Sequence, residues 1–399
     1  MGEQGESGIK SLYVHMPFCR GKCAYCDFIS FPLEDEEELG RYLKALVREM
    51  ALYSGAEPHT LYIGGGTPSL LDGRQFLYLH MGLRTHFRLG SVEEFSIEAN
   101  PDTVDEDRLA AWSSAGVNRV SLGVQSFNNT VLKTVHRSAT EADILHAVKL
   151  LREADIHNFG IDLILGLQFL YSHGDAESAF DLFQNDVVKA VTLHPAHISV
   201  YILSIAEHTT LGRMLSGHGY TMLDDDVFEK MYLWAVEFLE RHGYKQYELS
   251  NFALPEKESR HNMHYWRGED YIGLGLGAVS TQGCMRTRNC KDLDTYCTLI
   301  ETGKRPVEHE ELLNSDVQST EEIMLSLRMT DGLDIDQLMD GVSEGSADGL
   351  QVYLSSLFKY GFAKRSASRL VLTPAGMLRS NAVIADIVRF TEAGKNRHS

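Results

Sequence analysis

The stretch YVHMPFCRGKCAYCDF, residues 13–28, places Cys19, Cys23 and Cys26 in a C-x3-C-x2-C spacing. An aromatic residue, Tyr25, directly precedes the last cysteine. Cysteine thiolates are the usual ligands of iron–sulfur clusters, so three of them in one short loop predict a [4Fe–4S] cluster. A fourth cysteine ligand is not evident. The fourth iron would therefore be open to a small molecule, which is how radical enzymes bind S-adenosylmethionine.

A zinc site or disulfide bonds would also use cysteines of this kind. A Cys3His zinc site would take His15 as its fourth ligand, but such sites usually pair two short Cys/His spacings and the chain offers no second pair. The remaining cysteines, Cys284, Cys290 and Cys297, lie far downstream, and the first residues lack the apolar segment of a secretory leader. We therefore expect reduced thiols or metal ligands in a cytoplasmic protein.

Composition and charge predict a globular, acidic protein. The chain has 399 residues, enough for two or three domains, and 43% of them are hydrophobic. No apolar run approaches the roughly 18 residues of a membrane-spanning helix, so no transmembrane anchor is expected. The net charge of −19 would repel a phosphate backbone, which argues against a nucleic-acid partner.

Short apolar strands alternate with helical patterns through the first half of the chain. Strands are predicted at residues 11–16, 60–63, 94–99, 119–124, 158–165 and 197–203. This alternation indicates a parallel sheet with right-handed crossovers. The predicted fold class is therefore α/β, with a partial (β/α)6 TIM-like barrel over residues 1–215. Its active site is expected at the carboxyl ends of the strands.

The pattern changes in the second half. Residues 216–312 predict an α+β accessory region, with an amphipathic helix at 224–241 and short strands within 246–252 and 271–281. Residues 313–399 predict helices and a β-hairpin, which resembles a small winged-helix-like domain. Because of the negative charge, we expect this domain to have a structural or docking role.

Polar or glycine positions accompany nearly every predicted barrel strand. They are the glycine run 64–66 with Thr67, Glu98, Gln125, Asp162 and Ser204. Glycine allows a ligand to approach the backbone closely, and a carboxylate among apolar neighbours, such as Asp162, is costly unless it is paired. Arg137 has the planar fork that binds a carboxylate bidentately. Each residue alone would also suit a turn or the surface, but together they predict a ligand site.

These motifs resemble the radical S-adenosylmethionine proteins of the oxygen-independent coproporphyrinogen III oxidase family. The resemblance covers nearly the whole chain and rests on YVHMPFC (13–19), GGGTPS (64–69), SIEANP (96–101), SLGVQSF (121–127), DLILGL (162–167) and EEIMLSLR (321–328). It implies that the three cysteines bind the cluster. By matching motif, it implies that S-adenosylmethionine is bound by Tyr13, Tyr25, Gly65, Gly66, Thr67, Glu98, Gln125, Arg137, Asp162 and Ser204.

Two features resemble the heme-chaperone branch of that family. Phe28 stands where the oxidases have a further cysteine, and HNMHYW (residues 261–266) resembles the HNxxYW motif of the branch. The resemblance implies heme as cargo, with His261 as the first candidate contact and His264 and Tyr265 as second choices. Three alternatives stay open. The segment only docks the accessory region, the chain decarboxylates coproporphyrinogen III through a 5′-deoxyadenosyl radical, or it catalyses another radical reaction on a tetrapyrrole.

The chain departs from the family pattern at two places. QFLYS at residues 168–172 replaces the usual Pro-Gly-Gln-Thr beside the cofactor, and Val279 replaces a histidine of the branch. The implied partners are heme or a porphyrinogen and heme-accepting respiratory proteins. The chain would act as a monomer or a dimer.

Overall fold

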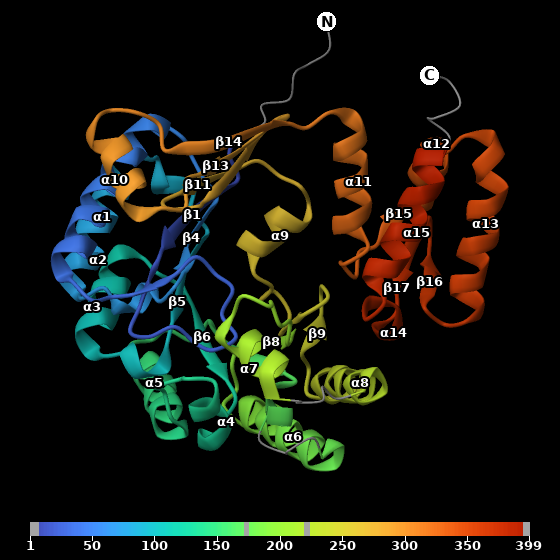
Figure 1. Cartoon of the computed structure of the whole chain (residues 1–399), viewed down its shortest axis with the longest axis horizontal. Coiled ribbons are helices and arrows are strands. Elements are labelled where there is room, and N and C mark those ends of the chain that lie inside the picture. Colours follow the sequence, from blue (N-terminus) through green and yellow to red (C-terminus); the bar gives the residue numbers. More distant parts are fainter. Residues whose placement is uncertain (1–7, 171–174, 219–223, 394–399) are drawn as a thin grey trace, which may run out of the picture.

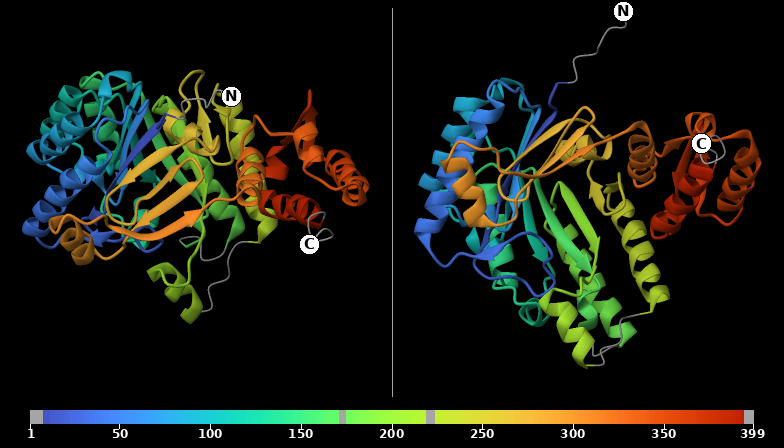
Figure 2. Two further views of the ribbon diagram at one scale, coloured as in Figure 1. Left: turned by 90° about the horizontal axis from the view of Figure 1, so that it is seen from above. Right: turned by 45° about the horizontal axis from the view of Figure 1, so that its top comes forward.

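The computed structural model describes residues 8–170, 175–218 and 224–393. Its main feature is a twelve-stranded sheet with the order β14-β13-β12-β11-β1-β4-β5-β6-β7-β8-β10-β9 (Figures 1 and 2). Six parallel strands follow the order of the sequence: β1 (Ser11–Met16), β4 (Thr60–Gly65), β5 (Glu94–Ala99), β6 (Arg119–Gln125), β7 (Phe159–Leu165) and β8 (His197–Ile202). They correspond to the six strands predicted from the sequence and confirm the partial α/β barrel.

Helices between these strands cover the outer face of the sheet (Figure 1). They are α1 (Glu36–Met50), α2 (Gly73–His86), α3 (Glu106–Ala115), α4 (Asn129–Thr134), α5 (Glu141–Glu153) and α6 (Ala176–Thr192). Most begin at a side chain that accepts a hydrogen bond from the first turn, such as Asp35 before α1 and Thr140 before α5. The acidic residues that follow Asp35 lie in the first turn of α1, where the helix dipole favours negative charge.

The barrel is open, because β8 does not pair with β1. Instead, β1 pairs in parallel with β11 (Tyr271–Leu274), and antiparallel strands follow at β12 (Val279–Gln282), β13 (Met285–Asn289) and β14 (Val307–Leu312). At the other edge, β8 pairs with β10 (Asn251–Ala253), and β10 pairs with β9 (Lys245–Gln246). The predicted accessory region therefore extends the barrel sheet at both of its edges.

The remaining helices before residue 313 are α7 (Thr210–His218), α8 (Asp225–Arg241), α9 (Arg260–Trp266) and α10 (Leu293–Glu301). Residues of the accessory region, such as Met231, Ile272 and Tyr296, are buried in the same hydrophobic core as the barrel. Within the described ranges, no helix is long and apolar enough to cross a bilayer.

The last part of the chain has a hydrophobic core of its own, which includes Leu327, Leu350 and Ile387. Its elements are α11 (Ser315–Ser326), β15 (Leu333–Asp334), α12 (Ile335–Asp340), α13 (Glu344–Lys359), β16 (Ala363–Ser366), β17 (Arg369–Leu372), α14 (Pro374–Met377) and α15 (Ser380–Ala393). The three strands form a small antiparallel sheet, as the winged-helix-like prediction requires. This C-terminal domain stands beside the open side of the barrel, with α9 between them (Figure 1).

Candidate functional site

The three cysteines lie in the segment that follows β1, at the carboxyl ends of the barrel strands. This segment, the cysteine loop, begins with the two-residue strand β2 (Phe18–Cys19). Cys19 is buried, Cys23 and Cys26 are partly exposed, and all three are free thiols. The loop turns tightly, because the Cys26 N–H donates to the Cys23 carbonyl at 3.1 Å. Burial raises the pKa of the Cys19 thiol, so binding of iron by this residue would release a proton.

His15 does not complete a zinc site with these cysteines. Its Nδ1 is 2.9 Å from the Tyr13 hydroxyl, and its Nε2 is 2.8 Å from the Ile29 carbonyl. Over the described parts of the chain, no three His, Cys, Asp or Glu side chains are grouped closely enough for a single metal ion. In this conformation, His15 is therefore not placed as the fourth ligand of a zinc site.

The glycine loop after β4 packs directly against the cysteine loop. The Gly66 N–H donates to the Met16 carbonyl at 2.7 Å, and the Thr67 N–H donates to the Phe18 carbonyl at 2.8 Å. A Cβ on Gly66 would lie 2.7 Å from the Phe18 carbonyl oxygen and 3.0 Å from Cys19 Sγ. Only glycine fits this close approach, so the two loops form one wall beside the predicted cluster.

We expect Gly66→Ala to lower both the stability of the protein and its iron content. The added methyl group must push a backbone carbonyl or Cys19 aside, which typically costs about 1–3 kcal/mol. Thermal unfolding and iron per chain after anaerobic reconstitution measure the two effects. Gly21→Ala is the matched control in the neighbouring cysteine loop, because nothing lies within 4 Å of its Cβ position. Equal iron contents in the two variants would contradict this packing argument.

Arg137, Gln125 and Asn100 converge on Gly123 of β6, where polar atoms of all three lie 3.0–3.4 Å from the position that a Cβ would take. Arg137 donates to the Gly123 carbonyl, its Nη1 is 3.7 Å from Cys23 Sγ, and no described carboxylate forms an ion pair with it. Gln125 has a φ of 68°, and its buried Oε1 lacks a hydrogen-bond partner among the described residues. A buried polar atom without a partner, as Gln125 Oε1 is, indicates a place for a ligand.

Glu98 and Asp162 are carboxylates on the inner face of the barrel. Glu98 accepts from the Tyr62 hydroxyl at 2.8 Å and from a backbone N–H of the glycine loop at 2.9 Å. Asp162 accepts from the hydroxyls of Ser121 at 2.9 Å and Ser199 at 2.6 Å. Burial raises the pKa of both carboxyl groups, that of Glu98 to about 7. A bound cationic group would favour their ionised forms.

Two further predicted residues join the cysteines to this polar group. Tyr25 lies beside the Arg137 guanidinium, and Thr67 forms a hydrogen bond with Cys19. Asn100 donates to the Thr67 hydroxyl at 3.3 Å and thereby connects the glycine loop to β5. Asn100 was not predicted from the sequence, although it lies in the SIEANP motif from which Glu98 was chosen.

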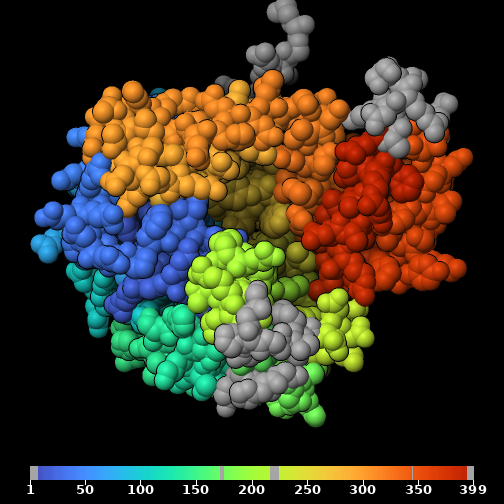
Figure 3. Space-filling view, viewed as in Figure 1, coloured from blue at the N-terminus to red at the C-terminus, as the bar shows by residue number. Residues whose placement is uncertain are grey.

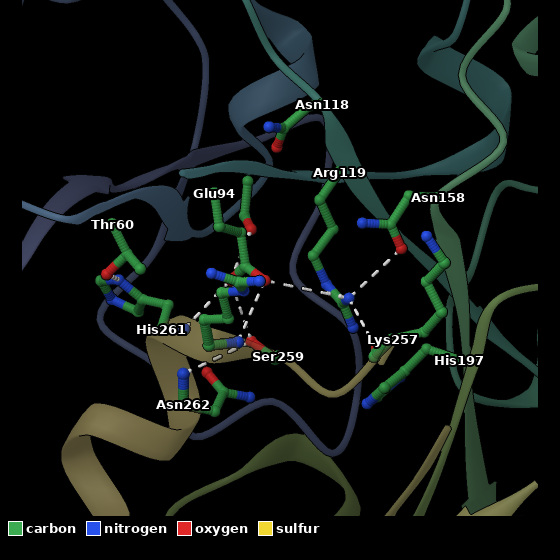
Figure 4. A network of polar contacts seen from close by, with 12 residues as sticks. Thr60, Glu94, Asn118, Arg119, Asn158, His197, Lys257, Ser259, His261 and Asn262 are labelled. Atoms are coloured by element: carbon green, nitrogen blue, oxygen red, sulfur yellow. Dashed lines mark hydrogen bonds and ion pairs between the residues drawn. The ribbon is translucent and has the colours of Figure 1, made fainter. Parts of the chain in front are cut away.

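The HNMHYW segment forms most of α9, which packs against the amino-terminal ends of β4 and β5, whereas the cysteines lie at the carboxyl ends of the strands. Figure 4 shows His261 beside Thr60 and Glu94 at these strand ends. Glu94, the first residue of β5, accepts from the first two backbone N–H groups of α9 at 3.0 Å each. Arg119, the first residue of β6, lies 4.0 Å from Glu94 and donates to the Lys257 carbonyl at 2.9 Å. Neither charged residue was predicted from the sequence to be functional. The feature that could have indicated them is a charged residue at the start of a predicted buried strand.

His261 is buried, and both of its ring nitrogens are engaged. Nδ1 is 2.9 Å from the Thr60 hydroxyl, and Nε2 is 2.9 Å from the Tyr265 hydroxyl. The ring stacks on Tyr62 at a centroid distance of 5.0 Å, and burial lowers its pKa to about 3. In this conformation, neither nitrogen is available to an iron atom. A heme contact by His261 would require α9 to rearrange.

The other two candidates differ in their surroundings. His264 Nδ1 is 2.8 Å from the Ser11 hydroxyl, and its Nε2 is 3.7 Å from Glu269. Tyr265 instead lines a cavity of about 1050 Å³ between the barrel, the accessory strands and the C-terminal domain. Figure 3 shows the molecule hollowed between these parts, with the α9 region at the base of the hollow. Tyr265 is therefore the one of the three that reaches the cavity.

Comparison with known proteins assigns the family. The Radical SAM superfamily model matches residues 13–170. The protein named heme chaperone HemW from Bacillus subtilis (strain 168) is 32% identical over 381 residues, which cover 94% of this chain and 98% of that protein. This chain belongs to the HemW family. The HemW protein of Lactococcus lactis subsp. lactis is 34% identical over 323 residues, or 81% of this chain and 82% of that protein.

A solved structure shows the same fold as this HemW family member. Coproporphyrinogen III oxidase (HemN) from Escherichia coli superposes with a TM-score of 0.81 at 24% identity, covering 97% of this chain and 91% of that one. The match includes the C-terminal domain and confirms the predicted fold.

Membership of the radical SAM superfamily implies a [4Fe–4S] cluster and S-adenosylmethionine, and the residues of this HemW family member fit both. Three free thiols share one loop, as a cluster requires. The Arg137 guanidinium, which has no carboxylate partner among the described residues, suits the carboxylate of an amino acid, and Glu98 suits its ammonium group.

Two predicted features stand apart from this HemW site. Ser204 is exposed just beyond β8. Within the described part of the chain, it forms no hydrogen bond with the other site residues. Gln168, the first residue of the atypical 168–172 segment, is buried and donates to Asp186 at 2.9 Å. The last two residues of that segment lie outside the described residues.

Proposed function

We propose that this chain is a heme chaperone, which binds heme and delivers it to acceptor proteins such as respiratory proteins. The observation that carries the proposal is its similarity to the B. subtilis heme chaperone HemW over nearly the full length of both proteins. The HNMHYW segment and Phe28 support the same assignment. Phe28 stands where an oxidase of this fold would have a further cysteine, and its ring is 70% exposed at the cavity.

The cofactor side of the protein would be built by residues at the carboxyl ends of the strands. Cys19, Cys23 and Cys26 would hold the cluster, which supplies an electron to S-adenosylmethionine when both are bound. Arg137 would bind the carboxylate of that cofactor and Glu98 its ammonium group, because these side chains have complementary charge. Gln125 and Asp162 would accept hydrogen bonds from the ribose hydroxyls.

The heme would bind beside α9, and the three candidate heme contacts would have roles different from those expected from the sequence. Tyr265 becomes the direct contact, since it lines the cavity. His261 and His264 become residues that hold α9 on the barrel, because their nitrogens bond Thr60 and Ser11. The sequence placed His261 first because an imidazole often ligates iron, but the motif says nothing about which way the ring points.

A hemin titration tests the proposal. We expect the Soret absorbance of the full chain to saturate at one heme per chain, with a defined difference spectrum. Serum albumin, treated identically, shows the absorbance change of specific hemin binding. A buffer blank shows the absorbance change of hemin dispersed without protein. A rise that never saturates, or that matches the buffer blank, would contradict the proposed function.

A further inference from the structure

We infer that heme lies in the cavity between the cysteine loop, α9 and the C-terminal domain, with its two propionates at Arg267 and Arg369. This inference rests on the proposed heme binding and adds where the heme lies and which residues hold it. Both arginines line the cavity, Arg267 at the end of α9 and Arg369 at the start of β17. The heme would thus bridge the barrel and the C-terminal domain.

The cavity has the size and the apolar walls that a porphyrin ring needs. Its volume of about 1050 Å³ is at the upper end of ordinary small-molecule pockets. Phe28 of the cysteine loop, Trp266 of α9, and Met324 and Leu325 of α11 present apolar surface from three separate elements. A flat, hydrophobic ring would cover these side chains, including the exposed Phe28 ring, which is otherwise in contact with water.

Most of the acidic groups around the cavity already have partners. Glu321 binds Arg286 through two hydrogen bonds of 2.6 and 2.8 Å, which joins α11 to β13. The other partnered acids are Asp27, 2.7 Å from His208, Glu269, 3.7 Å from His264, and Glu322, which accepts from Gln337 at 2.9 Å. Arg286 is therefore neutralised, and none of these four acids, nor Asp331 on the same cavity wall, forms an ion pair with Arg267 or Arg369 among the described residues.

Arg267 and Arg369 are the lining cations without a carboxylate partner among the described residues. Arg369 donates to two backbone carbonyls, those of Asp331 at 2.7 Å and Gly332 at 2.6 Å, which fixes the guanidinium without cancelling its charge. Arg267 is exposed and forms no ion pair within the described ranges. In a chain with a net charge of −19, two unpaired arginines at one cavity favour a ligand with two negative groups. A heme carries two, on one edge of an apolar ring.

Paired titrations with hemin and hemin dimethyl ester test this inference in the full chain. The ester keeps the ring and the iron but has no propionate charge. We expect Arg267→Ala and Arg369→Ala each to weaken hemin binding about three- to tenfold, as for partly exposed ion pairs, and the double variant to weaken it further. Binding of the ester should change less than twofold in every variant. Arg389→Ala is the matched control, an exposed arginine of the same C-terminal domain that lies outside the cavity.

The outcomes separate this inference from the proposed function. If the unmodified chain does not bind hemin, the proposed function fails. If it binds hemin, but the two arginine variants match Arg389→Ala, heme binding stands and the cavity assignment is wrong. If the arginine variants bind the ester as much more weakly as they bind hemin, the arginines act on the fold and not on the propionates. That result also overturns the assignment.

Discussion

We expect replacement of any one of Cys19, Cys23 and Cys26 with alanine to prevent assembly of the cluster. Two thiolates of one loop cannot hold a [4Fe–4S] unit that needs three, so we expect iron per chain to fall from about four to near zero after anaerobic reconstitution. Alanine is a mild replacement for a small, half-apolar side chain, so the fold should remain. Iron and sulfide analysis, with the charge-transfer absorbance of the cluster, measures the effect.

The matched control for this loss is Cys284→Ala. Cys284 is an exposed free cysteine in the accessory strands, away from the cluster loop. Its replacement should leave iron and sulfide at the level of the unmodified chain. A cluster retained in full by Cys23→Ala, or lost equally in Cys284→Ala, would contradict the assignment of the ligands.

We expect replacement of His261 with alanine to destabilise the fold strongly. It removes a buried ring from between Tyr62 and Tyr265 and leaves the Tyr265 hydroxyl without its partner, whereas the Thr60 hydroxyl keeps its hydrogen bond to Ser11. A cavity together with an unsatisfied hydroxyl typically costs about 2–5 kcal/mol. Urea unfolding measures the loss. His157→Ala, at an exposed histidine, is the control and should change stability by less than about 0.5 kcal/mol.

The pH dependence of this loss identifies its cause. The pKa of His261 is about 3 in the folded protein, whereas an unfolded histidine titrates near about 6.5. Between these pH values, the unfolded chain binds a proton at this histidine, whereas the folded chain does not. Each unit by which the pH falls in this range therefore lowers the free energy of unfolding of the unmodified protein by about 1.4 kcal/mol. The alanine variant lacks this group. The stability gap between the two proteins should therefore narrow by about 2 kcal/mol from pH 7 to pH 5. A gap that stays constant would show that the ring titrates normally.

His261→Asn separates a structural role from iron ligation. The asparagine amide can keep a hydrogen bond to Thr60, so this variant should retain more stability than His261→Ala. If the ring only holds α9, the Soret maximum of the heme complex should be unchanged in His261→Asn. A shifted Soret maximum, with an altered spin state, would restore His261 as an iron ligand.

The barrel could be predicted because its strands are defined by local sequence. β1 and β5 lie at the residues predicted for them, since strands buried on both faces are short apolar runs that end at turns. The candidate cluster ligands are equally local in the sequence, because one loop holds all three cysteines. Gly66 could be chosen for the same reason, since it belongs to a run of three glycines.

The remaining features depend on contacts between distant residues. β13 and β14 carry several charged side chains, and those of β14 are largely exposed, so no apolar alternation indicated that hairpin. The pairing of β11 with β1 joins residues about 260 positions apart, which no local pattern encodes. The orientation of His261 depends on Thr60 and Glu94 at the starts of two strands. The sequence could therefore indicate His261 as a candidate residue, but it could not show that the ring is buried.

The most direct test of the heme-chaperone assignment is an anaerobic turnover assay with coproporphyrinogen III. Protein with a verified cluster is supplied with reductant and S-adenosylmethionine, and protoporphyrinogen is measured, while the same preparation is titrated with hemin. We expect saturable hemin binding and no protoporphyrinogen above a control without protein. Formation of protoporphyrinogen at a catalytic rate would contradict the assignment and make the chain an oxidase despite Phe28.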